Sequence, residues 1–205
     1  MTSLSPVLMV NMFPISSGSQ CSVALKTLGS LTYFLGLEAN RSAVFHLKQS
    51  KYASDLLLKT KMLEANACST PMALGTKLFP NDSPPFDHPS LYRSTIGALQ
   101  YLTLTRPDIS FTVNKLSQFL QTPTELQWQG CKRVLRYIKG TLNYGLQFKP
   151  ASFLQIECYA DADADWGSSL EDRRSTSGYC IYLGPNLIQW SSRKQKVVAL
   201  SSTES

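Results

Sequence analysis

The ten residues from Ile156 to Asp165 alternate between apolar and polar side chains, and this alternation constrains the fold more than any other feature of the chain. Successive side chains of a β-strand point to opposite faces, so the pattern predicts a strand with Asp161, Asp163 and Asp165 on one face. Carboxylates stacked in this way repel one another, and a bound divalent cation is the usual means of offsetting that repulsion. A solvated acidic strand end or loop explains the spacing equally well, because Asp-rich turns are common.

Two apolar runs rich in β-forming residues follow this segment. They are Gly178–Gly184 and Leu187–Trp190, and Pro185 and Asn186 lie between them. Such runs separated by turn residues predict a β-hairpin. Together with the acidic strand, they indicate the start of a meander whose carboxylates lie on its first strand.

The first half of the chain reads as strands, a helix and a loop. Two strands are predicted around the polar turn Asn40–Ser42. Ser50 is expected to cap a helix whose apolar side chains recur at helical spacing as far as Leu63. Residues 68–89 contain five prolines and are expected to form a linker or surface loop with little regular structure.

Three further helices are predicted in the middle of the chain. Residues 91–104 are apolar at a helical period, and Asp108 is expected to cap a second helix that runs to Leu120. A third helix is predicted from Pro123 to Gly140. Its expected buried face consists of Trp128, Cys131, Val134, Leu135 and Ile138.

The third predicted helix also carries four cations, Lys132, Arg133, Arg136 and Lys139. They can form an ordinary solvated helix face. They can also contact nucleic-acid phosphates, in which case affinity would fall steeply with salt because counterions are released on binding. The formal net charge of +6 suits a polyanionic partner.

Composition narrows the class of protein. The 205 residues are 43% hydrophobic and 17% charged, which is typical of a folded chain of one or two domains. The five cysteines are scattered and form no CxxC pair, so we expect reduced thiols, an intracellular protein and no zinc site. The apolar run at residues 7–10 is too short to span a bilayer, and no Lys or Arg precedes Lys26, so neither a membrane partner nor a signal peptide is expected.

The run from Asp163 to Gln195, with DRRSTSG, WSSRKQ and the following SSTES, closely resembles the ribonuclease H segment of copia-type retrotransposon Pol polyproteins. The upstream motifs LGSLTYFLGLEA, LKQSKYASDLLLKTKML, CSTPM, TRPDIS and LRYIKGT resemble the same family, in family order. The resemblance covers about residues 25–205. It implies a reverse-transcriptase C-terminal part at residues 25–150 (palm end, thumb and connection) and a truncated ribonuclease H-like domain at 151–205. Residues 1–24 are unmatched and are expected to be poorly ordered.

The resemblance implies that an aspartate on the first strand of the ribonuclease H sheet binds catalytic Mg²⁺. The family pattern is Tyr-X-Asp-Ala-Asp-Trp, whereas Tyr159 is followed here by one additional Ala-Asp pair. Counting back from Trp166 makes Asp163 the catalytic and metal-binding residue, and counting forward from Tyr159 makes it Asp161. We favour Asp163 because the downstream match is long, and keep Asp161 as the alternate. The implied partner is an RNA–DNA hybrid or another nucleic acid.

Departures from the family pattern bear on activity. The family polymerises with a Tyr-X-Asp-Asp turn, and no aspartate precedes Asp55 here. The glutamate expected as the next nuclease ligand would follow Glu204 by two positions, just past Ser205. The sequence therefore predicts an α+β chain that is a catalytically inactive Pol remnant with an incomplete mixed sheet. Two alternatives remain: a nucleic-acid-binding protein that uses the basic thumb helix, and a ribonuclease H that another chain completes.

Overall fold

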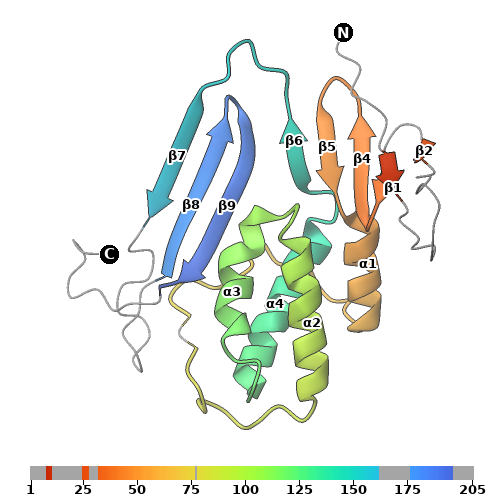
Figure 1. Cartoon of the computed structure of the whole chain (residues 1–205). Helices are drawn as coiled ribbons and strands as arrows, with labels where there is room; N and C mark the ends of the chain where they lie inside the picture. The colour runs from red at the N-terminus through yellow and green to blue at the C-terminus, as the bar shows by residue number, and fades with distance from the viewer. Residues whose placement is uncertain (1–7, 11–24, 28–31, 77, 162–175, 196–205) are drawn as a thin grey trace, which may run out of the picture.

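The computed structural model describes residues 8–10, 25–27, 32–76, 78–161 and 176–195, which form helices and antiparallel sheets (Figure 1). The mixture confirms the predicted α+β class. The described elements, in chain order, are β1 (Leu8–Val10), β2 (Leu25–Thr27), β3 (Tyr33–Phe34), β4 (Leu37–Arg41), β5 (Phe45–Lys48), α1 (Ser50–Lys59), α2 (Pro89–Leu102), the 3-10 helix η1 (Pro107–Ile109), α3 (Ser110–Ser117), α4 (Glu125–Gly140), β6 (Gly145–Phe148), β7 (Ile156–Asp161), β8 (Thr176–Leu183) and β9 (Asn186–Lys194).

Three sheets are present in the described part of the chain, with strand orders β1-β2, β3-β4-β5-β6 and β7-β8-β9. Every described pairing is antiparallel, so the described part of the last sheet is the meander that the sequence predicted. The described strands do not test the mixed sheet that we expected. Within the first 24 residues the structure describes only Leu8–Val10, which pair with Leu25–Thr27. The rest of that segment, and its expected poor order, lie outside the described residues.

The structure has one more strand here than the sequence predicted, because β3 and β4 form a hairpin before β5. Phe34 pairs with Leu37, which leaves Leu35 and Gly36 as a two-residue loop, and both have positive φ (48° and 77°). Such loops match the twist of the flanking strands. The Tyr101 hydroxyl on α2 donates a hydrogen bond to the Leu35 carbonyl oxygen, so a contact from a distant helix holds the loop in place.

β6 follows the four α-helices in the chain and pairs with β5, which precedes them. Phe45 pairs with Phe148 and Lys48 with Gly145, so β6 extends the sheet on the far side of β5 (Figure 1). A Cβ at Gly145 would collide with the Leu47 carbonyl oxygen and lie 2.8 Å from the Lys48 Cβ. Only glycine permits this close approach of the two strands.

The four α-helices enclose the main core. Ile96, Leu99 and Leu102 of α2 are fully buried, as the sequence predicted. The predicted face of α4 is buried too, and it comprises Trp128, Cys131, Val134, Leu135 and Ile138. The described residues between 68 and 88 are irregular, as expected, but Leu78 and Phe86 among them are buried in the core, and the centre of the Phe86 ring lies 4.8 Å from that of Trp128 in a stacked contact.

Two predicted helix caps are wrong. Gln49, and not Ser50, is the N-cap of α1, and its side-chain oxygen accepts a hydrogen bond from the buried Thr105 hydroxyl at 2.8 Å.

The end of α1 and the start of α3 also differ from the prediction. α1 ends at Lys59, before the predicted end at Leu63, because Lys61 has a positive φ of 56°. The 3-10 helix η1 precedes α3, and Asp108 binds Arg106 instead of capping α3.

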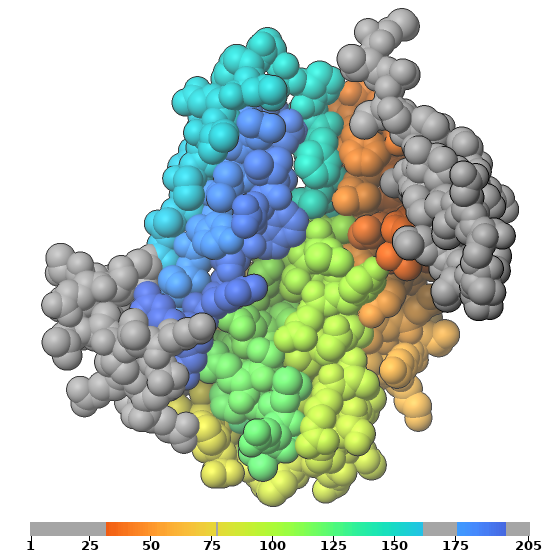
Figure 2. Space-filling model, viewed as in Figure 1, coloured from red at the N-terminus to blue at the C-terminus, as the bar shows by residue number. Residues whose placement is uncertain are grey.

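The β7-β8-β9 meander rests on the helices through β9, which contacts α3 and β6. In the space-filling view, the blue surface of the β8–β9 hairpin meets the green surface of α3 (Figure 2). The Asn186 side chain accepts a hydrogen bond from the Lys149 N–H at 2.7 Å and donates one to the Lys149 carbonyl oxygen at 3.0 Å. These contacts fix the meander next to the end of β6.

Candidate functional site

The predicted acidic strand exists as β7, and it forms one edge of its sheet (Figure 1). Asp161 is its last residue, pairs with Gly178 of β8, and shares a face with Glu157 and Tyr159. All six residues of β7 are exposed. Asp163, our favoured metal-binding residue, lies outside the described residues, so the structure does not test the choice between Asp163 and Asp161.

Tyr159 and Glu157 contact each other along the same face of β7. The Tyr159 hydroxyl donates a hydrogen bond to Glu157 Oε2 at 3.0 Å. This hydrogen bond, together with the charge of the carboxylate, raises the pKa of Tyr159 above its usual value. One of the two described carboxylates on this face is therefore already bound to a neighbouring hydroxyl.

A magnesium site needs a cluster of ligands, and the described side chains do not supply one. Within them, no three His, Cys, Asp or Glu residues lie close enough together to hold a metal ion. Two-metal hydrolysis requires several carboxylates around ions that lie about 3.5–4 Å apart. The described residues therefore do not fit a magnesium pair.

The four cations of α4 are half-buried, and two of them hold a loop. Arg133 Nη2 donates a hydrogen bond to Thr70 Oγ1 at 2.8 Å, and Arg136 Nε donates one to the Asn66 carbonyl oxygen at 2.6 Å. These bonds tie the irregular segment after α1 to α4. The sequence did not reveal this role, because the partners lie more than 60 residues upstream.

The other two cations of α4 are the lysines. Lys132 Nζ lies 5.7 Å from the centre of the Trp128 ring, within cation–π range. Lys139 lies in the last turn of the helix, where a positive charge is favourable next to the unpaired carbonyl groups. All four predicted cations therefore lie on α4. The acidic strand β7 belongs to the β7-β8-β9 sheet, and the four cations do not form part of that sheet.

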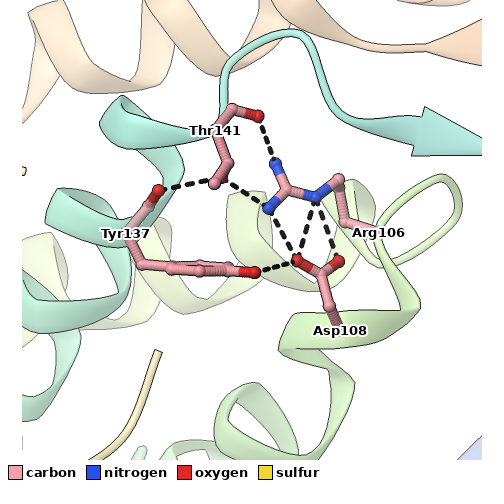
Figure 3. Close-up of polar contacts among 4 residues, drawn as sticks. All are labelled: Arg106, Asp108, Tyr137 and Thr141. Carbon is pink, nitrogen blue, oxygen red and sulfur yellow. Dashed lines mark hydrogen bonds and ion pairs between the residues drawn. The ribbon is translucent and has the colours of Figure 1, made fainter. Parts of the chain in front are cut away.

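A polar cluster around the buried side chain of Arg106 joins the two distinctive sequence motifs TRPDIS and LRYIKGT (Figure 3). The Arg106 side chain is 5% exposed and forms an ion pair with Asp108, with Nη2 at 2.7 Å from Oδ2 and Nε at 3.0 Å from Oδ1. The guanidinium also donates to Thr141, to its carbonyl oxygen at 3.0 Å and to its Oγ1 at 2.7 Å. The Tyr137 hydroxyl donates to Asp108 Oδ2 at 2.8 Å. The cluster therefore connects η1 to the C-terminal end of α4.

The cluster shifts the pKa of two of its members. Burial alone would raise the pKa of Asp108, but the hydrogen bond and charge of Arg106, with the Tyr137 hydroxyl, outweigh burial and hold that pKa below its usual value. Burial and the hydrogen bond to Asp108 raise the pKa of Tyr137. Both shifts favour the ionised carboxylate and the neutral phenol that the cluster requires.

Two aromatic rings also contact Arg106. The guanidinium lies 5.5 Å from the ring centres of Tyr137 and Tyr144. Both distances lie within cation–π range, so the two rings add to the contacts that hold the guanidinium. The two motifs that make the sequence recognisable therefore stabilise the fold, whereas the sequence had predicted Asp108 only as a helix cap.

Known proteins resemble this chain over most of its length. The chain is 47% identical over 182 residues to the retrovirus-related Pol polyprotein from transposon RE1 of Arabidopsis thaliana, and 46% identical over 182 residues to that from transposon RE2. It is also 43% identical over 183 residues to the uncharacterized mitochondrial protein AtMg00810 of A. thaliana, and that alignment covers 75% of the relative. The chain belongs to the retrotransposon Pol family.

The match to the Pol family covers 88% of this chain but only 12% of the RE1 and RE2 polyproteins. No family model matches the chain, and no solved structure matches it. None of the helices in the described part of the chain combines the length and apolar character that crossing a bilayer requires.

Proposed function

We propose that residues 25–150 correspond to the end of a reverse-transcriptase palm with its thumb and connection, and residues 151–205 to the first part of a ribonuclease H-like domain. The order of the elements supports this assignment: a hairpin sheet, then a helical unit, then a meander that begins with an acidic strand. Kinship with the Pol family supports it as well. The proposal makes the chain a segment that spans the junction of two Pol domains.

On this proposal the chain catalyses neither DNA synthesis nor hybrid cleavage by itself. One observation carries this conclusion: the His, Cys, Asp and Glu side chains of the described residues do not gather into a metal-binding group. Asp161 stands on an exposed edge strand, and both activities need carboxylates that hold two ions together. The function is then that of a Pol-derived, non-catalytic protein.

The test is an assay of the purified chain for primer extension and for cleavage of a labelled RNA–DNA hybrid, with Mg²⁺ and with Mn²⁺. We expect no product above that of the Asp161→Asn and Asp163→Asn variants. An active ribonuclease H serves as the control for the substrate. Cleavage that disappears in the Asp163→Asn variant would contradict the proposal and would assign the metal-binding residue.

Nucleic-acid binding through α4 is a second candidate function. Lys132, Arg136 and Lys139 are spaced i, i+4 and i+7, which places them on one side of the helix. Neither of the two ion pairs found among the described residues involves α4. A strip of cations outside these ion pairs suits the phosphate backbone of an RNA–DNA hybrid.

The binding test uses the two lysines, because replacing Arg133 or Arg136 would also release the loop at residues 66–70. The double variant Lys132→Ala/Lys139→Ala is compared with Lys59→Ala/Lys61→Ala, which removes the same charge from exposed positions on and just after α1. Hybrid affinity should fall in the first variant, and the slope of log affinity against log salt should decrease by about one for each phosphate that is no longer neutralised. Equal affinities for the two double variants would exclude α4 as the contact surface.

A further inference from the structure

One edge of the β7-β8-β9 sheet is open in the described part of the chain. β7 pairs with β8 on one side, and no described strand pairs with it on the other (Figure 1). β9, at the opposite edge of the same sheet, contacts α3 and β6. β7 is thus a six-residue edge strand whose outer side pairs with no described strand.

The backbone of β7 presents a defined set of hydrogen-bonding groups on its outer side. The Gly184 N–H donates to the Gln155 carbonyl oxygen at 2.7 Å, and Ile156 pairs with Leu183, so Gln155 lies directly opposite Gly184. Along an antiparallel pair, residues that bond to the facing strand alternate with residues whose N–H and C=O groups point away from it. The residues whose backbone groups point outward are therefore Ile156, Cys158 and Ala160.

β7 lacks the usual features that protect an open edge. Natural proteins block such edges with lysine, proline or a β-bulge. β7 contains neither lysine nor proline, and its pairing with β8 runs over all six residues without a register shift. Every residue of β7 is exposed, and Ile156 and Tyr159 are 69% and 61% exposed. An exposed edge of this kind is suited to receive another extended strand.

We propose that the outer edge of β7 binds β7 of a second copy of this chain, antiparallel and with Cys158 on the twofold axis. In this register Cys158 exchanges backbone hydrogen bonds with the partner's Cys158, and Ile156 does so with the partner's Ala160. All the outward-pointing residues of one β7 are then paired with those of the other. A register centred on Glu157 would instead place two like carboxylates opposite each other, which is destabilising.

The side chains on both faces of the paired strands are complementary in this register. Ile156, Cys158 and Ala160 share one face of β7, so apolar and small side chains meet their like across the axis. On the other face, Glu157 lies opposite the partner's Tyr159. These two residue types already form a hydrogen bond of 3.0 Å within β7, so the same chemistry is available between copies. The twofold axis repeats each contact.

Sedimentation velocity of the whole chain under reducing conditions tests the association, at concentrations from about 1 to about 200 μM, because a small interface gives a weak dimer. We expect a concentration-dependent dimer. Cys158→Pro should weaken it about tenfold or more, because the outward N–H is lost and the proline ring blocks the edge. The melting temperature should stay close to that of the parent, since an edge strand accepts proline where the N–H faces solvent.

A charge exchange tests the register. Cys158→Lys and Cys158→Asp should each abolish the dimer when alone, because like charges would face each other across the axis. An equimolar mixture of the two variants should form a heterodimer, since residue 158 then faces an opposite charge. Asn40→Lys is the matched control: it adds the same charge at an exposed position on β4 and should leave dimerisation unchanged.

Three results would overturn the inference. A chain that is monomeric at every concentration excludes a second copy as the occupant of the edge. A dimer that persists in Cys158→Pro and in Cys158→Lys assigns the association to another surface. A dimer that is lost in both charge variants but does not return in their mixture excludes the axis at Cys158. If Cys158→Pro does not fold, the charge exchange decides by itself.

Discussion

Replacing Arg106 with alanine is expected to lower the free energy of unfolding by about 3 kcal/mol. The guanidinium is 5% exposed and forms an ion pair with Asp108 at 2.7 Å. Removing one partner of a buried pair costs about 3–5 kcal/mol, because the other charge is left buried without compensation. The Asp108 side chain is 33% exposed and keeps part of its hydration, so the lower end of that range applies.

The destabilisation should extend to both elements that the cluster joins. Arg106 also donates two hydrogen bonds to Thr141, which follows the last turn of α4. Urea unfolding monitored by circular dichroism measures the change, and the melting temperature should fall by roughly 6–12 °C for a chain of this size. Hydrogen exchange should show the largest decrease in protection near η1 and the end of α4.

The matched control is a half-buried ion pair with a longer separation, Lys48–Glu38, whose closest atoms are 3.9 Å apart and whose side chains are 29% and 26% exposed, so that neither partner is buried as Arg106 is. Lys48→Ala should cost about 0–1 kcal/mol, because water already screens that pair. If Arg106→Ala were no more destabilising than Lys48→Ala, the argument that the Arg106 cluster stabilises the fold would be refuted.

Three further outcomes are expected. Because the pKa of Asp108 is lower in the folded than in the unfolded chain, its contribution to stability is present above about pH 4 and disappears as the pH falls through the folded pKa. The free energies of unfolding of the parent chain and of Asp108→Asn, measured by urea titration, should therefore converge in acid. Gly145→Ala should destabilise the β5–β6 pairing by about 1–3 kcal/mol, measured by thermal unfolding, whereas an equal melting temperature would show that the strands can separate without cost. Burial raises the pKa of Cys131 to about 12, so iodoacetamide should label the exposed Cys158 rapidly at neutral pH and leave Cys131 unmodified until the chain unfolds, as read by mass spectrometry.

The helix α4 could be predicted because its apolar spacing and its N-terminal residues indicate the same element. In α4, Trp128 to Ile138 recur at helical intervals, and Thr124 and Gln127 supply the N-terminal signal; the Gln127 oxygen accepts a hydrogen bond from the Thr124 N–H at 2.8 Å. The meander could be predicted for the same reason, since Gly184 and Pro185 separate two β-rich runs. Local pattern and observed structure coincide at both places.

The failures occurred where a distant contact decided the local structure. Asp108 precedes a helix and has the chemistry of a cap, but Arg106 and Tyr137 bind its carboxylate instead. Leu35 is not a turn-forming residue, yet its carbonyl accepts the hydroxyl of Tyr101 and the loop closes around it. Neither partner can be identified from spacing in the sequence.

The candidate site divides in the same way. Alternation predicted correctly that residues 156–161 form a strand next to a hairpin, whereas Asp163 and Asp165, which were predicted on the same face as Asp161, lie outside the described residues. It could not reveal that Arg133 contacts Thr70, nor that Phe111 of α3 and Trp190 of β9 line the same depression, because the members of each pair come from separate elements. Asp163, the residue on which the nuclease assignment depends, lies outside the described residues.

Binding of Mn²⁺ to the purified chain, measured by electron paramagnetic resonance, tests the central claim most directly, because it detects a two-ion site without requiring turnover. The account predicts no saturable site whose affinity changes in the Asp161→Asn/Asp163→Asn double variant. Two coupled ions that bind to the parent chain but not to that variant would contradict it, because they would show that the chain assembles a complete nuclease centre.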